Sequence, residues 1–162
     1  MSNSVENYLC AVGEVATMAS LMDAILMNTY KILAKVDLKT ATETMYEKDS
    51  YRSRRRLVLE AAESWNMEQV ARAELETLMA LSARISVERR DFIHSFIGKH
   101  GRIYLKNLQQ PAKAIDDAIV NGRVKQMQND LHAMHRAFGR LGRALGIPRE
   151  LEYLVGDEKI YL

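Results

Sequence analysis

The chain has 162 residues, which is enough for one domain with a buried core and too short for two comfortable ones. Hydrophobic residues make up 48% and charged residues 27%, and only two prolines and eight glycines occur, which indicates a soluble helical protein. The net charge of +2 does not by itself indicate a nucleic-acid binder, so such a role must depend on a local basic patch.

These features predict one domain over residues 1–162, an all-α bundle of four to five main helices. The helices are expected to run up and down, with the first and the last of them long. The core is expected to cover about residues 5–146. Residues 147–162 form a tail whose aromatic and aliphatic side chains predict docking on the bundle.

Cys10 is the only cysteine, which excludes an intramolecular disulfide and a cysteine-based metal cage and fits a reducing compartment. The N-terminus lacks the basic segment of a secretory signal, and no apolar run approaches the roughly 20 residues of a membrane-spanning helix. We therefore expect a cytoplasmic protein without membrane association, and no motif indicates a metal or a cofactor.

The first half of the chain contains two predicted helices with identifiable starts. Ser4 is expected to cap a helix from Val5 to about Ala34, whose apolar residues lie on several sides. This helix is either the central one or part of a subunit interface. Asp37 is expected to cap a short second helix to about Tyr46, and residues 47–50 are expected to form a loop.

Four arginines, Arg52, Arg54, Arg55 and Arg56, then precede an apolar run that begins at Leu57. They are candidates for binding phosphate groups. A charge run of this kind is also typical of a solvated first turn of a helix, although positive charge is unfavourable at a helix N-terminus.

The next predicted helix starts at Met67 after a cap at Asn66 and ends at Gly98 and Gly101, unless Ser86 begins a new helix. Its apolar residues keep one face at helical spacing, namely Leu78, Leu81, Ile85, Phe92 and Phe96. Arg89 falls in this row, where a hydrophobic residue is expected. Because a guanidinium keeps its charge, this side chain must find acceptors or water.

His94 follows five residues after Arg89, roughly 140° further round the helix, and shares the face of Arg90. A neighbouring guanidinium favours the neutral imidazole, whereas the Asp91 carboxylate favours the charged form. His94 is therefore a candidate for proton exchange near neutral pH, and the sequence leaves open which neighbour dominates.

The segment Arg89-Arg-Asp-Phe-Ile-His94 resembles the motif of the HEPN superfamily of helical nucleases and toxins, an arginine followed after four to six residues by a histidine. Residues 12–25 are similar to the first long helix of small bacterial and phage members, and residues 50–59 to their basic segment. The likeness covers residues 5 to about 100, and the last helix matches only in type. Two positions differ: the family commonly has a small polar residue at position 90, and some toxins have tyrosine at position 96, where this chain has Phe96.

The resemblance implies a metal-independent endoribonuclease of a toxin or defence system that cleaves RNA by attack of its own 2′-hydroxyl. His94 would be the general acid or base, Arg89 would stabilise the transition-state phosphate, and Arg90 and Asp91 would support them. The arginines at 52 to 56 would bind the nucleic acid. A homodimer, RNA and an antitoxin or other protein are the implied partners.

Two alternatives to a nuclease remain open. In the first, the protein is a catalytically silent helical dimer that acts as a protein-interaction module, and Arg89 and His94 are groups of its interface or core. In the second, the protein binds nucleic acid without any chemistry.

The second half of the chain is predicted to end in a long helix. Residues 101–108 have a period-two pattern, but we predict no sheet there. Pro111 is expected to begin a short helix through about Val120 that stops at Asn121 and Gly122. A heptad-like seam then predicts a long helix that ends before Gly146, and His132 and His135 are read as surface histidines. Their three-residue spacing also suits a metal, but the sequence offers no further ligand.

Overall fold

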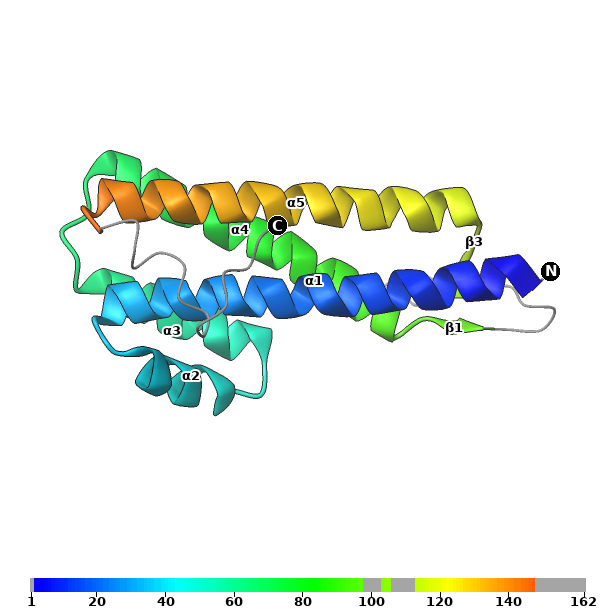
Figure 1. Cartoon of the computed structure of the whole chain (residues 1–162), viewed down its shortest axis with the longest axis horizontal. Coiled ribbons are helices and arrows are strands. Elements are labelled where there is room, and N and C mark those ends of the chain that lie inside the picture. Colours follow the sequence, from blue (N-terminus) through cyan, green and yellow to red (C-terminus); the bar gives the residue numbers. More distant parts are fainter. Residues whose placement is uncertain (1, 98–102, 106–112, 148–162) are drawn as a thin grey trace.

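The computed structural model describes residues 2–97, 103–105 and 113–147, and this part of the chain folds as an all-α bundle (Figure 1). The prediction of a helical bundle with long first and last helices is confirmed. The helices are α1 (Ser2–Ala34), α2 (Leu38–Tyr46), α3 (Tyr51–Glu63), α4 (Gln69–Ile93) and α5 (Asp117–Ala144).

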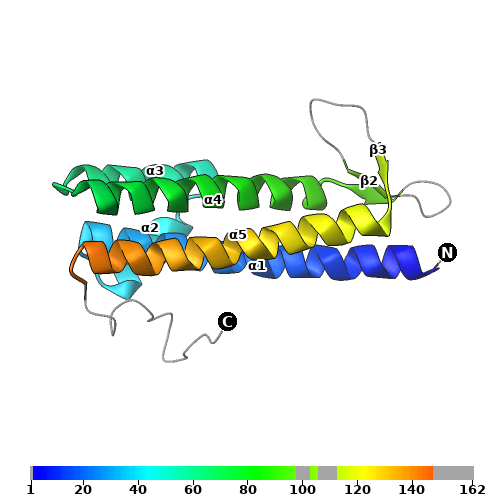
Figure 2. The ribbon, with the colours of Figure 1, turned by 90° about the horizontal axis from the view of Figure 1, so that it is seen from above.

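The three long helices lie lengthwise beside one another, and α2 and α3 pack at one end of them (Figures 1 and 2). The α1 and α5 helices are parallel, because Asn7 bonds to Asn121 and Glu14 bonds to Gln128 at the same sequence separation of 114 residues. The α4 helix runs antiparallel to α5, since Glu74 pairs with Arg140 whereas Glu88 pairs with Arg123.

The α1 helix is the central helix of the bundle and packs against α2, α3, α4 and α5. Val15, Met22 and Leu26 are fully buried, and further buried side chains lie on other sides of the same helix. The segment Val5–Ala34 is also long and apolar enough, by length and composition, to cross a membrane. The prediction that no apolar run approaches this length is therefore wrong, although a buried core helix meets the same criterion.

The predicted cap of α2 is confirmed, and α3 has a cap at Ser50 that we did not predict. The Asp37 carboxylate accepts a hydrogen bond of 2.7 Å from the Thr40 backbone N–H at the start of α2. Ser50 caps α3 in the same way, through the Ser53 N–H at 3.1 Å. These side-chain acceptors satisfy backbone donors that have no partner inside the helix.

Other boundaries differ from the predictions. The α4 helix begins at Gln69, with Glu68 rather than Asn66 in the cap position, and it continues through Ser86 without a break. It ends at Ile93, before Gly98, and His94 occupies its C-cap. Phe96 therefore does not extend the apolar face of α4, because it lies in a strand.

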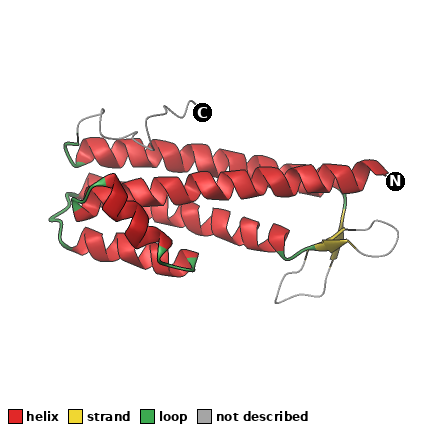
Figure 3. Cartoon of the chain, turned by 60° about the horizontal axis from the view of Figure 1, so that its bottom comes forward, coloured by secondary structure: helices red, strands yellow, loops and turns green. Residues whose placement is uncertain are grey.

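The connection from α4 to α5 contains a small antiparallel sheet, which lies at the end of the bundle where α4 ends (Figure 3). Its strands are β1 (Phe96–Ile97), β2 (Ile103–Leu105) and β3 (Lys113–Ile115), in the order β1-β2-β3. Our predictions of no sheet and of a helix starting at Pro111 are thus wrong. The period-two pattern of residues 101–108 indicated the strand. Residues 103–105 pair with residues 113–115, and this pairing satisfies backbone N–H and C=O groups that a short isolated helix would leave exposed.

The α5 helix begins after Asp116, whose carboxylate accepts a bond of 2.9 Å from the Ile119 N–H. It passes through Asn121 and Gly122, so the predicted stop there is wrong. Val120 and Val124, which lie on either side of Asn121 and Gly122, are both buried, and their burial outweighs the low helix propensity of glycine. The predicted end is confirmed, because Gly146 has a φ of 69° and the Ile147 N–H donates to the Gly142 carbonyl at 2.9 Å. The predicted docking of the tail falls on residues 148–162, outside the described ones.

Replacement of Gly122 by alanine is expected to stabilise the protein by about 0.5–1 kcal/mol, because Gly122 lies inside a helix. A Cβ at this position meets nothing within 4 Å. Gly146→Ala is the matched control and is expected to destabilise by about 1 kcal/mol, because alanine is strained at positive φ. Urea unfolding measures both changes, and equal destabilisation by the two variants would contradict a continuous α5.

Acid is expected to weaken the start of α2. Hydrogen bonding to Thr40 lowers the pKa of Asp37 below its ordinary value. The ionised Asp37 cap therefore stabilises the fold above about pH 4, and this stabilisation is lost as the pH falls through the pKa that Asp37 has in the folded protein. The Asp37→Asn variant should lose this pH dependence, whereas Asp49→Asn, in the exposed loop before α3, should keep it. Thermal unfolding between pH 6 and pH 2.5 measures the difference, and an unchanged acid slope in Asp37→Asn would count against the cap.

Candidate functional site

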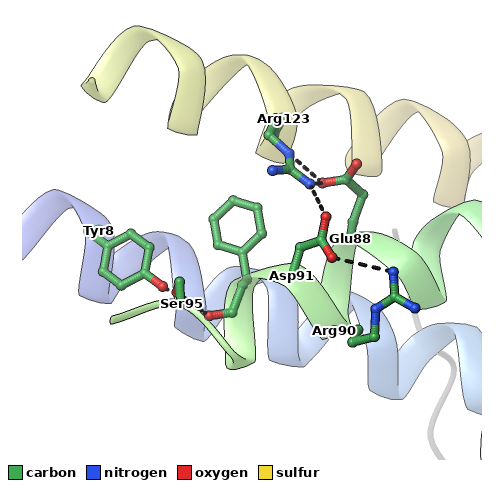
Figure 4. Close-up of polar contacts among 7 residues, drawn as sticks. Tyr8, Glu88, Arg90, Asp91, Ser95 and Arg123 are labelled. Atoms are coloured by element: carbon green, nitrogen blue, oxygen red, sulfur yellow. Dashed lines mark hydrogen bonds and ion pairs between the residues drawn. The ribbon is translucent and has the colours of Figure 1, made fainter. Parts of the chain in front are cut away.

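The α1 helix anchors the last turn of α4 (Figure 4). The Tyr8 hydroxyl donates a hydrogen bond of 2.9 Å to the Phe92 backbone carbonyl, and the two aromatic rings stack with centroids 6.2 Å apart. The Ser95 hydroxyl donates to the same carbonyl. Burial raises the pKa of the Tyr8 phenol, which keeps the donor protonated well into the alkaline range. The end of α4 is therefore fixed relative to α1.

The α5 helix holds the same turn through Arg123. The Arg123 Nε donates to Glu88 at 2.7 Å and its Nη2 to Asp91 at 3.0 Å, while the guanidinium lies 5.5 Å from the centre of the Phe92 ring. Burial of the guanidinium opposes its charge, but the hydrogen bonds to Glu88 and Asp91 outweigh this and raise the pKa of Arg123. One cation thus joins two carboxylates of α4 to α5.

Asp91 belongs to this clamp. Its carboxylate is buried, and the second oxygen, Oδ1, lies 3.5 Å from Arg90 Nη2 in a weak ion pair (Figure 4). That oxygen has no hydrogen-bond partner among the described residues. The predicted contact in which Asp91 orients the imidazole of His94 is not formed within the described part of the chain.

Arg89 and His94 are both exposed to solvent. Arg89 shares the helical row of Ile85 and Phe92 yet is not buried, so it meets its need for hydrogen bonds through water. The reason is that α3 does not extend along the whole of α4. The first residue of α3, Tyr51, bonds to Ser82, so α3 covers α4 only on the N-terminal side of Ser82 and leaves the Arg89 part uncovered (Figure 2). Within residues 2–97, 103–105 and 113–147, no hydrogen bond or ion pair is made by either side chain.

The two side chains leave the helix in different directions. Five residues at about 100° per residue separate them by roughly 140° around the axis, so they do not meet over one point of the surface. A single chain therefore presents a cation and an imidazole near one end of the bundle but does not bring them together.

The four arginines at the start of α3 have different environments. Arg54 is mostly buried, and its Nη1 donates to Asp23 at 2.7 Å while its Nε donates to the Lys48 carbonyl. Arg56 pairs with Glu60 on the helix surface at 3.3 Å. Arg52 and Arg55 are exposed and make no such pair in the part of the chain that the structure describes. Arg54 is a structural residue, and the candidate phosphate-binding groups reduce to Arg52 and Arg55.

The sequence interpretation missed Tyr8, Glu88 and Arg123. A signal for the last two was present, since Glu88 and Asp91 are three residues apart on one face of α4 and such a carboxylate pair calls for a cation from a neighbouring helix. Nothing in the sequence distinguished Tyr8 from other apolar residues of α1. No group of three metal-ligating side chains occurs among the described residues.

Comparisons with protein-family models, with curated proteins and with solved structures find no match to this chain. The resemblance to HEPN proteins therefore depends on the residues of the chain alone.

Arg123→Met is expected to destabilise the protein by about 1.5–3 kcal/mol, because Glu88 and the buried Asp91 lose their charged donor. Arg90→Met removes only the weak contact of 3.5 Å at a half-exposed guanidinium, and it should cost less than about 0.5 kcal/mol. Chemical unfolding in urea compares the two variants. Equal losses would show that Arg123 does not hold α4 against α5.

Proposed function

We propose that the protein is a metal-independent endoribonuclease of the HEPN type in which Arg89 and His94 are the reactive side chains. The observation that supports this proposal is the contrast between these two residues and their neighbours. Asp91 is held by Arg123, whereas Arg89 and His94 are exposed and without intramolecular partners among the described residues. Both lie on a helix end anchored by Tyr8 and Arg123.

The reaction needs no group beyond the substrate and these side chains. The 2′-oxygen of one nucleotide forms a bond to the adjacent phosphorus, and the bond from phosphorus to the 5′-oxygen of the next nucleotide breaks. An imidazole takes the proton of the 2′-hydroxyl, and an imidazolium gives a proton to the leaving 5′-oxygen. The products are a 2′,3′-cyclic phosphate and a 5′-hydroxyl. The guanidinium of Arg89 stabilises the charge that grows on the phosphoryl oxygens.

The step as written uses one imidazole and one imidazolium, and each chain supplies one histidine at the motif. We infer that the active form is a homodimer in which two copies of Arg89 and His94 face one cleft. Arg52, Arg55 and the half-exposed Arg90 would add salt-dependent affinity for the RNA backbone. An antitoxin or another protein that covers the cleft would keep such an enzyme inactive in the cytoplasm.

A catalytically silent helical dimer is the second candidate. It is favoured by the arrangement around Asp91, because this carboxylate serves the Arg123 clamp and leaves His94 without an orienting partner among the described residues. The RNA assay below separates the two candidates.

Purified protein is expected to cleave labelled single-stranded RNA in the presence of EDTA and to leave cyclic phosphate ends. His94→Ala should lower the cleavage rate by about 10²–10⁴-fold, the typical contribution of a general acid or base. Arg89→Ala should lower it as well, because the phosphoryl charge loses its cation. Gel analysis and end-group mass spectrometry measure the rate and the products.

The matched controls are His132→Ala and Arg136→Ala, which remove an exposed histidine and an exposed arginine of α5. Both should cleave at the rate of the unchanged protein. Intact RNA with a folded, dimeric protein, or equal activity in His94→Ala, would favour the silent dimer over the nuclease.

A further inference from the structure

A groove of about 340 Å³ lies between α3 and α4, away from the end of α4 that carries Arg89 and His94. Leu59, Leu75 and Met79 form its apolar floor; Leu75 and Met79 are otherwise buried in the core. Ala80 and Glu76 lie on the α4 wall. Arg55 stands on the α3 side and Arg72 on the α4 side, so an aliphatic surface runs between two cations.

These two arginines differ from those that hold the bundle together. Arg54, Arg84, Arg123 and Arg140 each pair with a carboxylate of another helix, at distances between 2.6 and 3.0 Å. Arg55 and Arg72 are exposed, and neither makes an ion pair or hydrogen bond through its side chain within the described residues. Two unneutralised guanidinium groups beside an apolar floor suit an occupant that alternates carboxylates with apolar side chains.

The chain itself contains such a segment. Residues 150–158 read Glu-Leu-Glu-Tyr-Leu-Val-Gly-Asp-Glu, with four carboxylates, no cation and four large apolar side chains. We infer that the C-terminal segment 148–162 binds in the α3–α4 groove of its own chain, with its carboxylates beside Arg55 and Arg72 and its apolar side chains on Leu59, Leu75 and Met79.

The other grooves among the described residues fit this segment less well. The one between α4 and α5 is lined by Arg84, Glu88 and Asp130, and Arg84 already pairs with Asp130, so its lining has no unpaired cation for a carboxylate. The one along α5 is lined by Arg136, Arg140, Arg143, His135 and Gly139, and so offers charge without an aliphatic floor. The groove between α1 and α5 has one cation, Lys125, and one carboxylate, Glu14, and most of its other lining side chains are small or neutral and polar. The floor of the α3–α4 groove has no aromatic ring for base stacking, so RNA there would contact only the two arginines, through its phosphates.

The start of the segment is within reach of the groove. The contact of 2.6 Å between Arg140 and Glu74 places the last part of α5 beside the first part of α4, two residues from Arg72. Ile147 follows Arg140 by seven residues, about 10 Å of helix. An extended chain advances about 3.3 Å per residue, so the segment spans up to roughly 50 Å.

Crosslinking within the full chain tests the inference. In a Cys10→Ser background, Ala80→Cys in the groove is combined with Val155→Cys in the segment, and a short bismaleimide joins the two thiols. The control pair combines Val155→Cys with His132→Cys, on the exposed surface of α5. The groove pair should crosslink within one chain at least about tenfold faster than the control pair.

Charge reversal gives the second readout. Arg55→Glu with Arg72→Glu should slow the groove crosslink about tenfold, a difference of ~1.4 kcal/mol. Adding Glu150→Lys and Glu152→Lys to that variant should restore the rate, whereas these two lysine substitutions alone should slow it. Arg52→Glu makes the same charge change outside the groove lining and should leave the rate unaltered. A variant that had lost its fold would not regain the crosslink when Glu150 and Glu152 are also replaced by lysine. Recovery of the rate therefore shows a charge-complementary contact rather than an effect on folding.

Three results would overturn the inference. Equal crosslinking rates at the groove and control positions would show that the segment does not choose the groove. Crosslinks formed only between two chains would assign the groove to a second copy. Protection of Ala80→Cys from maleimide by single-stranded RNA, without any effect of the segment's charges, would assign it to nucleic acid. None of these readouts requires nuclease activity, so the inference and the proposed function fail separately.

Discussion

The clamp formed by Arg123 determines how the end of α4 lies between α1 and α5. One guanidinium neutralises Glu88 and Asp91 and covers the Phe92 ring, while Tyr8 binds the Phe92 carbonyl from the opposite helix. Each group satisfies another that would be costly to bury alone. Because Asp91 and Phe92 are used internally, Arg89 and His94 face solvent together with Arg90 and Ile93.

The other arginines of the bundle also fall into two groups, those that pair with a carboxylate of another helix and those that are exposed. A guanidinium that joins two helices is partly desolvated and bound by a carboxylate, as Arg54 is by Asp23, and so contributes to structure. Arg52, Arg55, Arg72 and Arg89 remain exposed without such partners in the described part of the chain, and they carry the proposed interactions with phosphate groups or with carboxylates.

Much of the helical pattern could be predicted because it depends on local chemistry. The cap at Asp37 and the long apolar seam of α5 are short-range features, and they appear in the structure where the residues indicate. The predictions that failed depended on distant contacts. Asn121 and Gly122 read as a stop, but burial of Val120 and Val124 against other helices continues α5 through them, and the strands form only because residues 103–105 meet residues 113–115.

The sequence by itself determined the helical class and the presence of an arginine and a histidine five residues apart near the end of a helix. Only the tertiary structure decided which polar side chains remain available. Arg54 and Asp91 are held by partners 31 and 32 residues away, whereas Arg89 is exposed because α3 begins beside Ser82 and leaves the rest of α4 uncovered. Periodicity places a residue on a face of its helix, but the lengths and contacts of the other helices decide whether that face is covered.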